Sequence, residues 1–128
     1  MSILVSTDGT QYSEKAVRFA IEIAKCRRTP LVILHIVRSK RGVESEKIVK
    51  DGMQLLERIR TVSTAHGVET LTFLESGVVF DIILAKAEET GAEMIVLGSS
   101  GNSHETQLIG STSEHVVHNA KCSVAVVK

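Results

Sequence analysis

Ile3-Leu4-Val5-Ser6-Thr7-Asp8-Gly9 opens the chain with an apolar run that stops at hydroxyl and carboxylate side chains. Four more short runs rich in valine, isoleucine and leucine follow it, and they cover Leu31 to Val37, Thr70 to Leu74, Met94 to Gly98 and Val124 to Val127. Short apolar runs of this kind are typical of strands that are covered on both faces. The sequence therefore predicts five strands, the first from Ile3 to Thr7.

The gaps between these runs carry apolar residues at helical spacing, which predicts one helix in each gap. The four apolar faces are Ala16, Phe19, Ala20, Ile23 and Ala24; Ile48, Leu55, Leu56, Ile59 and Val62; Val79, Ile82, Ile83 and Ala87; and Ile109, Val116, Val117 and Ala120. We expect Ser13 to cap the first helix and Gly91 to end the third. The polar stretch from Arg38 to Lys47 is expected to be a loop.

Alternating strands and helices predict a parallel sheet with helices on both faces, because each right-handed crossover must pack back onto the sheet. The expected fold class is α/β, a three-layer, doubly wound, five-stranded parallel sheet in the order 3-2-1-4-5, Rossmann-like or flavodoxin-like. One domain, residues 1–128, is expected. Ligands of such sheets lie beyond the carboxyl ends of the strands, where the strand order reverses. Functional residues should therefore follow the first, second and fourth strands.

The composition excludes some classes of function. Fifteen basic and fifteen acidic residues give a net charge of zero, which disfavours a protein that binds nucleic acid by neutralising phosphates. No apolar run is long enough to span a bilayer, so no membrane partner is expected. The two cysteines, Cys26 and Cys122, indicate a reducing cytoplasm rather than a disulfide framework. Both are expected to be buried.

Two glycine-containing segments offer a site for an anion. Gly98-Ser99-Ser100-Gly101 leaves the fourth strand, and Gly110-Ser111-Thr112-Ser113 opens the last helix. Glycines let backbone amides approach an anion, and a helix N-terminus adds unpaired donors and the positive end of a dipole. The alternative is that the glycines only turn the chain and Ser111 only caps a helix. Neither the dinucleotide fingerprint nor the phosphate-loop fingerprint of nucleotide-binding proteins is present.

Three segments together resemble the universal stress protein family: residues 3–10 (Ile-Leu-Val-Ser-Thr-Asp-Gly-Thr), Leu34-His35-Ile36-Val37, and residues 98–112. The resemblance covers essentially the whole chain. The family's signature is Gly-x-x-Gly, nine residues, then Gly-Ser/Thr. This sequence has Gly98, Gly101 and Gly110-Ser111, with eight residues between the second and third glycines.

The resemblance implies an adenine-nucleotide-binding protein with a regulatory role in the stress response, with ATP or AMP as the ligand and Mg²⁺ as a candidate companion ion. By position, it implies that Asp8 contacts the ribose while Ser6 and Thr7 line the adjacent backbone. Ile36 would read the adenine edge, and Leu97 and Gly98 would face the base and sugar. The phosphate end of the nucleotide-binding site would consist of Gly101, Gly110, Ser111 and Thr112.

The resemblance also implies a homodimer, because many members of the family pair through their last strand. No catalytic residue and no metal site are expected, although slow hydrolysis of ATP by the protein stays open. A rival reading is the same fold without nucleotide, acting as a protein-interaction module. A phosphatase is disfavoured because Ser6 stands where the nucleophilic aspartate of haloacid dehalogenase-type enzymes would be.

Single residues have plainer alternatives. Asp8 with Gly9 can simply initiate a turn. His35 is expected to be a hydrogen-bonded core residue. The spacing of His115, His118 and Cys122 would suit a metal on one helix face, but Cys122 is expected to lie past the helix end.

Overall fold

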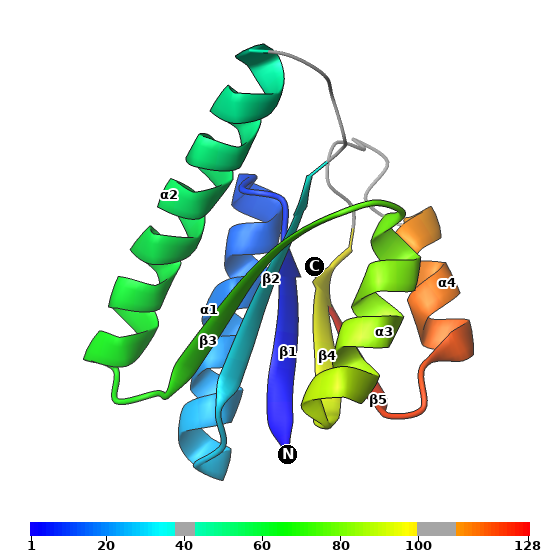
Figure 1. The fold of residues 1–128 in the computed structure, drawn as a ribbon. Helices are drawn as coiled ribbons and strands as arrows, with labels where there is room; N and C mark the ends of the chain where they lie inside the picture. The colour runs from blue at the N-terminus through cyan, green and yellow to red at the C-terminus, as the bar shows by residue number, and fades with distance from the viewer. Residues whose placement is uncertain (38–42, 100–109) are drawn as a thin grey trace.

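The computed structural model describes residues 1–37, 43–99 and 110–128. It contains five strands, β1 (Ser2–Thr7), β2 (Leu31–Val37), β3 (Thr70–Ser76), β4 (Ala92–Gly98) and β5 (Ser123–Val127). All neighbouring strands are parallel, and their order is β3-β2-β1-β4-β5 (Figure 1). The predicted α/β class and strand order are confirmed.

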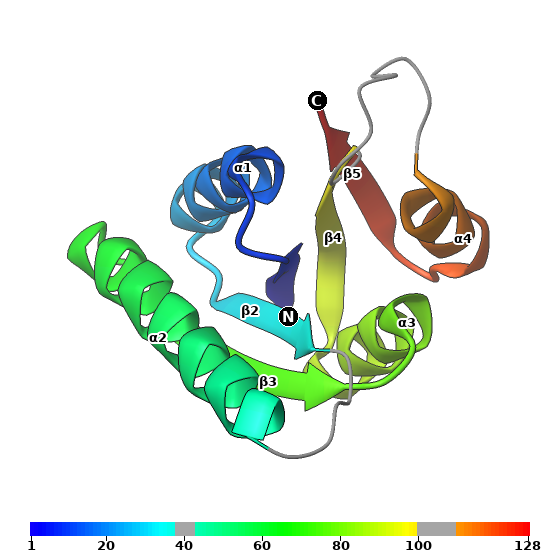
Figure 2. The same cartoon turned by 90° about the horizontal axis from the view of Figure 1, so that it is seen from above.

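Four helices connect the strands: α1 (Gln11–Arg27), α2 (Val43–Ala65), α3 (Val79–Thr90) and α4 (Ser111–Asn119). Seen from above, α1 and α2 lie on one face of the sheet, and α3 and α4 lie on the other (Figure 2). The chain crosses from one face to the other between β3 and β4, so β1 and β4 are neighbours whose following helices lie on opposite faces. The strand order reverses at this pair, which makes it the switch point of the sheet.

The core consists of two apolar layers, one on each face of the sheet. Ile3 and Val5 point toward α1 and α2, whereas Leu4 between them points toward α3 and α4, and all three are fully buried. Complete burial of side chains of this size contributes about 1.5–3 kcal/mol each. The central strands are therefore rigidly held, and they fix the positions of the loops at their carboxyl ends.

The helix boundaries differ from the sequence-based expectation in two places. Helix α2 begins at Val43, so the expected loop from Arg38 to Lys47 is wrong in its second half. Glutamate and lysine have good helix propensity, and acidic residues such as Glu46 favour the first turns of a helix. The N-cap of α1 is Thr10, not Ser13, and its hydroxyl oxygen accepts from the Ser13 amide.

Several burial expectations are also wrong. Val117 is 45% exposed, and Cys122 is only partly buried. Val62 is 49% exposed, and Ser63 takes the inward position beside it, fully buried and hydrogen-bonded to Thr70. Cys26 lies on the exposed side of α1, because the buried side of this helix is formed by residues such as Ala20, Ile21 and Ala24. Gly91 ends α3 as expected. No helix among the described residues is long and apolar enough to cross a membrane.

Candidate functional site

The β1–α1 loop is held by a compact set of hydroxyl hydrogen bonds. The Ser13 hydroxyl donates to the Thr10 carbonyl over 3.0 Å, and the Ser13 oxygen lies 2.9 Å from the Thr7 hydroxyl oxygen. A serine hydroxyl has one hydrogen to donate, so Thr7 is the donor in the second contact. The Thr7 oxygen in turn accepts from the Gly9 amide over 3.2 Å. Thr7 and Ser13 are both buried, and they fix the loop from inside.

Asp8 lies at the exposed tip of this loop. Its Oδ1 atom accepts from the Thr10 amide over 2.9 Å and from the Thr10 hydroxyl over 2.6 Å. Gly9 follows at φ +84°, a left-handed conformation that glycine adopts without strain. The expected Asp-Gly turn is therefore present, and it holds the carboxylate in a fixed orientation at the carboxyl end of β1.

The Asp8 carboxyl is poised as an anion. Partial burial raises the pKa of the Asp8 carboxyl, but the hydrogen bonds that Oδ1 accepts from the Thr10 hydroxyl and amide, together with the neighbouring polar groups of the loop, outweigh burial and leave this pKa below its usual value. The carboxylate is therefore charged at neutral pH. Because both Thr10 donors reach Oδ1, the second carboxylate oxygen is left for an incoming hydroxyl donor.

Gly98 brings the end of β4 against the start of α1. A Cβ atom at Gly98 would lie 3.3 Å from the Tyr12 carbonyl oxygen and 3.6 Å from the Ser13 Cα atom. Both contacts are to backbone, which cannot rotate away as a side chain can. A side chain at position 98 would therefore push β4 and α1 apart, and the loop bearing Asp8 with them.

The start of α4 is tied to the end of β4 by two hydrogen bonds. The Gly110 amide donates to the Ser99 carbonyl over 2.9 Å, and the Ser113 hydroxyl donates to the Gly98 carbonyl over 3.1 Å. Gly110 is the N-cap of α4, and it has no side chain to accept from the amides of the first turn. The helix N-terminus, with Ser111 and Thr112 in its first turn, is therefore held at the switch point with amides that have no intrahelical partner.

Three residues of the predicted site lie on the α3/α4 face of the sheet, toward the carboxyl ends of the strands. Ile36 and Leu97 belong to the apolar layer under α3 and α4. Ser6 lies two residues after Leu4 on β1, so it points to the same face. Thr7 points to the opposite face, and its carbonyl accepts from His35 Nδ1 over 2.7 Å. His35 is thus hydrogen-bonded, as expected from the sequence.

The remaining candidates are placed only in part. Gly101 and the eight-residue segment after it lie outside the described residues. The His115 ring stacks on Phe80 with centroids 3.8 Å apart, and His118 lies 4.0 Å from Glu114. Cys122 lies past the end of α4, as expected.

The side chains that hold the site together were not predicted from the sequence. Thr10 orients Asp8, Ser13 fixes the loop from inside, and Ser113 ties α4 to β4. A threonine two residues after an aspartate and directly before a helical pattern is a signal for Thr10. Ser113 carries no local signal, because its partner lies fifteen residues earlier in the chain.

The doubly wound sheet, with its polar groups gathered at the switch point, places this chain among the α/β proteins that carry their functional residues at the carboxyl edge of the sheet. More narrowly, the chain belongs to the universal stress protein family, whose sequence model matches residues 1–128.

Individual relatives agree with this assignment. A universal stress protein of Methanocaldococcus jannaschii is 31% identical over 137 residues, which covers 98% of this chain and 81% of the relative. A solved universal stress protein of Archaeoglobus fulgidus superposes with a TM-score of 0.84 at 25% identity, and the match covers 100% of this chain and 98% of that one. An Archaeoglobus fulgidus universal stress protein solved in complex with dAMP superposes at 0.80 and 23% identity, covering 100% and 98%.

Proposed function

We propose that this protein binds an adenine nucleotide, ATP or AMP, at the switch point between β1 and β4 and uses it as a regulatory ligand in a stress response. One observation carries the proposal. A charged, oriented carboxylate at Asp8 and the open N-terminus of α4 are anchored to the same strand pair. A nucleotide needs both kinds of group, an acceptor for its ribose hydroxyls and donors for its phosphate.

In this proposal the residues divide by chemistry. The ribose hydroxyls donate to Asp8, and the phosphate accepts from the amides and hydroxyls of Ser111 and Thr112, which Gly110 leaves uncovered. The apolar side chains of Ile36 and Leu97 lie on the α3/α4 face, where the adenine ring would pack. The backbone of Ser6 and Gly98 lines the path between base and sugar. A complex with dAMP in a protein of the same fold supports an adenine nucleotide as the ligand.

The proposal is tested by titrating AMP, ADP and ATP, the last with and without Mg²⁺, into the purified chain by isothermal titration calorimetry. Native mass spectrometry of freshly purified protein identifies any nucleotide that copurifies with it from the cell. We expect a 1:1 complex with at least one of the three. No binding in either experiment would favour the rival function, a protein-interaction module of the same fold.

We further propose that the nucleotide is bound rather than turned over. Of the described groups near the proposed phosphate, Ser111 and Thr112 offer hydroxyls and backbone amides, and Glu114 lies 4.0 Å from His118. The carboxylate of Asp8 is held in a turn through Oδ1 and is assigned to the ribose. A hydrolase needs a positioned base or a metal-held water beside the scissile phosphate. Release of ADP from ATP, followed over hours, measures this directly, and multiple turnovers per minute would contradict the proposal.

We also propose that the chain forms a homodimer through β5. Strand β5 is at one edge of the sheet, and its residues Val124 to Val127 are only half-buried. Unpaired apolar edges invite pairing with another chain, and zero net charge opposes association little.

The dimer proposal predicts that Val126→Lys gives a monomer, because a lysine on the edge strand opposes pairing. The matched control is Leu71→Lys on β3, the opposite edge, where Leu71 is 49% exposed. Light scattering at micromolar concentration should give a dimer mass for the parent and for the control. A monomer mass for the parent would refute the dimer.

A further inference from the structure

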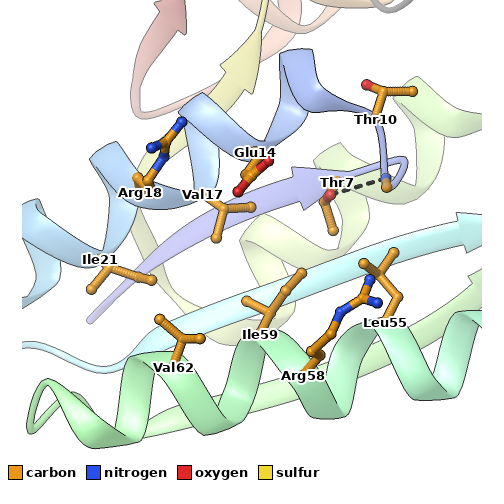
Figure 3. A pocket seen from close by; sticks show the side chains of 11 residues that line it. Thr7, Thr10, Glu14, Val17, Arg18, Ile21, Leu55, Arg58, Ile59 and Val62 are labelled. Carbon is orange, nitrogen blue, oxygen red and sulfur yellow. Dashed lines mark hydrogen bonds between the residues drawn. The ribbon is translucent and has the colours of Figure 1, made fainter.

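A groove of about 410 Å³ runs between α1 and α2, on the face of the sheet opposite Ile36 and Leu97 (Figure 3). Ligand pockets in proteins commonly measure about 300–1,000 Å³ and are mostly apolar with a few polar groups. The two helices lie over the same face of the sheet (Figure 2), and side chains from both of them line the groove (Figure 3).

The part of the groove away from the β1–α1 loop is apolar. Val17 and Ile21 come from α1, and Ile59 and Val62 come from α2. Val17 and Ile21 are each 6% exposed and form the floor, whereas Val62 is 49% exposed at the opening. A half-exposed valine beside a buried apolar floor leaves hydrocarbon in contact with water, so a hydrocarbon chain placed there removes apolar surface from both partners.

Two arginines lie on opposite walls of the groove, Arg18 on α1 and Arg58 on α2. Within the part of the chain that the structure describes, neither guanidinium forms an ion pair. Glu14, one helical turn before Arg18 on α1, is the one acidic side chain among the lining residues. The walls therefore carry two positive charges and one negative charge beside an apolar floor.

We propose that this groove binds a free anionic amphiphile, a single hydrocarbon chain with a carboxylate head, separately from the nucleotide. The chain lies on the apolar floor and the head group lies between Arg18 and Arg58, because a guanidinium recognises a carboxylate through two parallel hydrogen bonds. The upper end of the groove is formed by Thr7, Gly9 and Thr10 of the β1–α1 loop. The amphiphile is thus adjacent to the loop that presents Asp8 and touches none of the proposed phosphate-binding residues.

The test uses dodecanoate below its micellar concentration, titrated calorimetrically into the full chain without nucleotide. Dodecyltrimethylammonium, with the same chain length and the opposite charge, is the comparison ligand. We expect saturable 1:1 binding of dodecanoate and at least tenfold weaker binding of the cation. The result does not depend on nucleotide binding, so the two proposals succeed or fail separately.

Variants locate the binding. An exposed charged pair contributes little, so Arg18→Ala and Arg58→Ala should each weaken the binding of dodecanoate about fivefold. Arg60→Ala is the matched control, because Arg60 is on the same helix but faces Glu57 at 4.0 Å and does not line the groove. Glu14→Gln should strengthen binding, because it removes the opposing charge.

A blocking variant tests the apolar floor without disturbing the core. Val62→Trp fills the opening from a half-exposed position and should abolish dodecanoate binding, while circular dichroism reports whether the fold is intact. The proposal is overturned if the parent shows no saturable binding. It is equally overturned if the cation binds as tightly as dodecanoate, or if Arg60→Ala weakens binding as much as Arg58→Ala does.

Discussion

Gly98→Val is expected to destabilise the protein by about 3 kcal/mol, near the upper end of the range for overpacking a tight site. The physical reason is the 3.3 Å between a Cβ atom at Gly98 and the Tyr12 carbonyl oxygen. Valine adds two methyl groups to that contact, and the neighbouring atoms are backbone on two elements that the core holds in place. Urea unfolding followed by circular dichroism measures the loss.

Two further variants make this prediction specific. Gly98→Ala adds only the Cβ atom and should cost less than valine. Gly110→Ala changes the other structured glycine of the predicted phosphate segment, where φ is −64° and any residue is unstrained. The free energy of unfolding of Gly110→Ala should change by much less than that of Gly98→Val. If Gly98→Val unfolds at the same urea concentration as the parent, the close approach of β4 and α1 is not what fixes this edge of the sheet.

The proposed nucleotide site predicts that Gly98→Val also abolishes nucleotide binding. Separating β4 from α1 moves the Asp8 loop away from the start of α4, because Ser113 and Gly110 tie α4 to the end of β4. A folded Gly98→Ala variant with weakened AMP binding would show this coupling without the complication of unfolding.

The fold was accessible from the sequence because the strands are covered on both faces. A run of valine, isoleucine and leucine broken only by His35 identified β2 to the residue. Similar runs located the other strands but made them too short. Strand β4 begins two residues before the predicted Met94, and β3 extends two residues past the predicted Leu74. The missed residues include Glu93 and Glu75, whose charges form ion pairs with Arg27 and Lys86. Polar residues at strand ends carry no apolar signal, so the boundaries were the weakest part of the prediction.

The site was accessible only where its chemistry is local. The turn at Asp8 and Gly9 involves only three consecutive residues, Asp8 to Thr10, and the sequence predicted that turn. The contact between Gly98 and Tyr12 joins residues far apart in the chain, and no pattern in either segment predicts it. The groove between α1 and α2 depends on how far apart two helices lie on the same face of the sheet, which periodicity does not determine. Helical periodicity placed Val62 in the core because it reports the facing direction of a residue, not how closely the next helix approaches.

Asp8→Ala is expected to weaken AMP binding at least tenfold, because a hydrogen bond to a charged group contributes about 1.5–3 kcal/mol and 1.4 kcal/mol is a factor of ten. The variant alone is ambiguous. Asp8 Oδ1 also accepts from the Thr10 amide and hydroxyl, so alanine removes the hydrogen bonds of a turn as well as the proposed ribose contact. A loss of binding in this variant therefore has two explanations, one structural and one chemical.

Asp8→Asn and Thr10→Ala separate them. Asparagine keeps an oxygen that accepts from Thr10 and removes the charge, so its stability should stay near that of the parent while AMP binding falls. Thr10→Ala keeps the carboxylate and removes the N-cap of α1, which costs about 1 kcal/mol of stability, and its AMP affinity should stay within about threefold of the parent, or 0.6 kcal/mol. Calorimetry with AMP and urea unfolding on the three variants give the full comparison. If Asp8→Asn binds AMP as tightly as the parent while Thr10→Ala does not, the role of Asp8 is to form the turn, and the ribose is held by other groups.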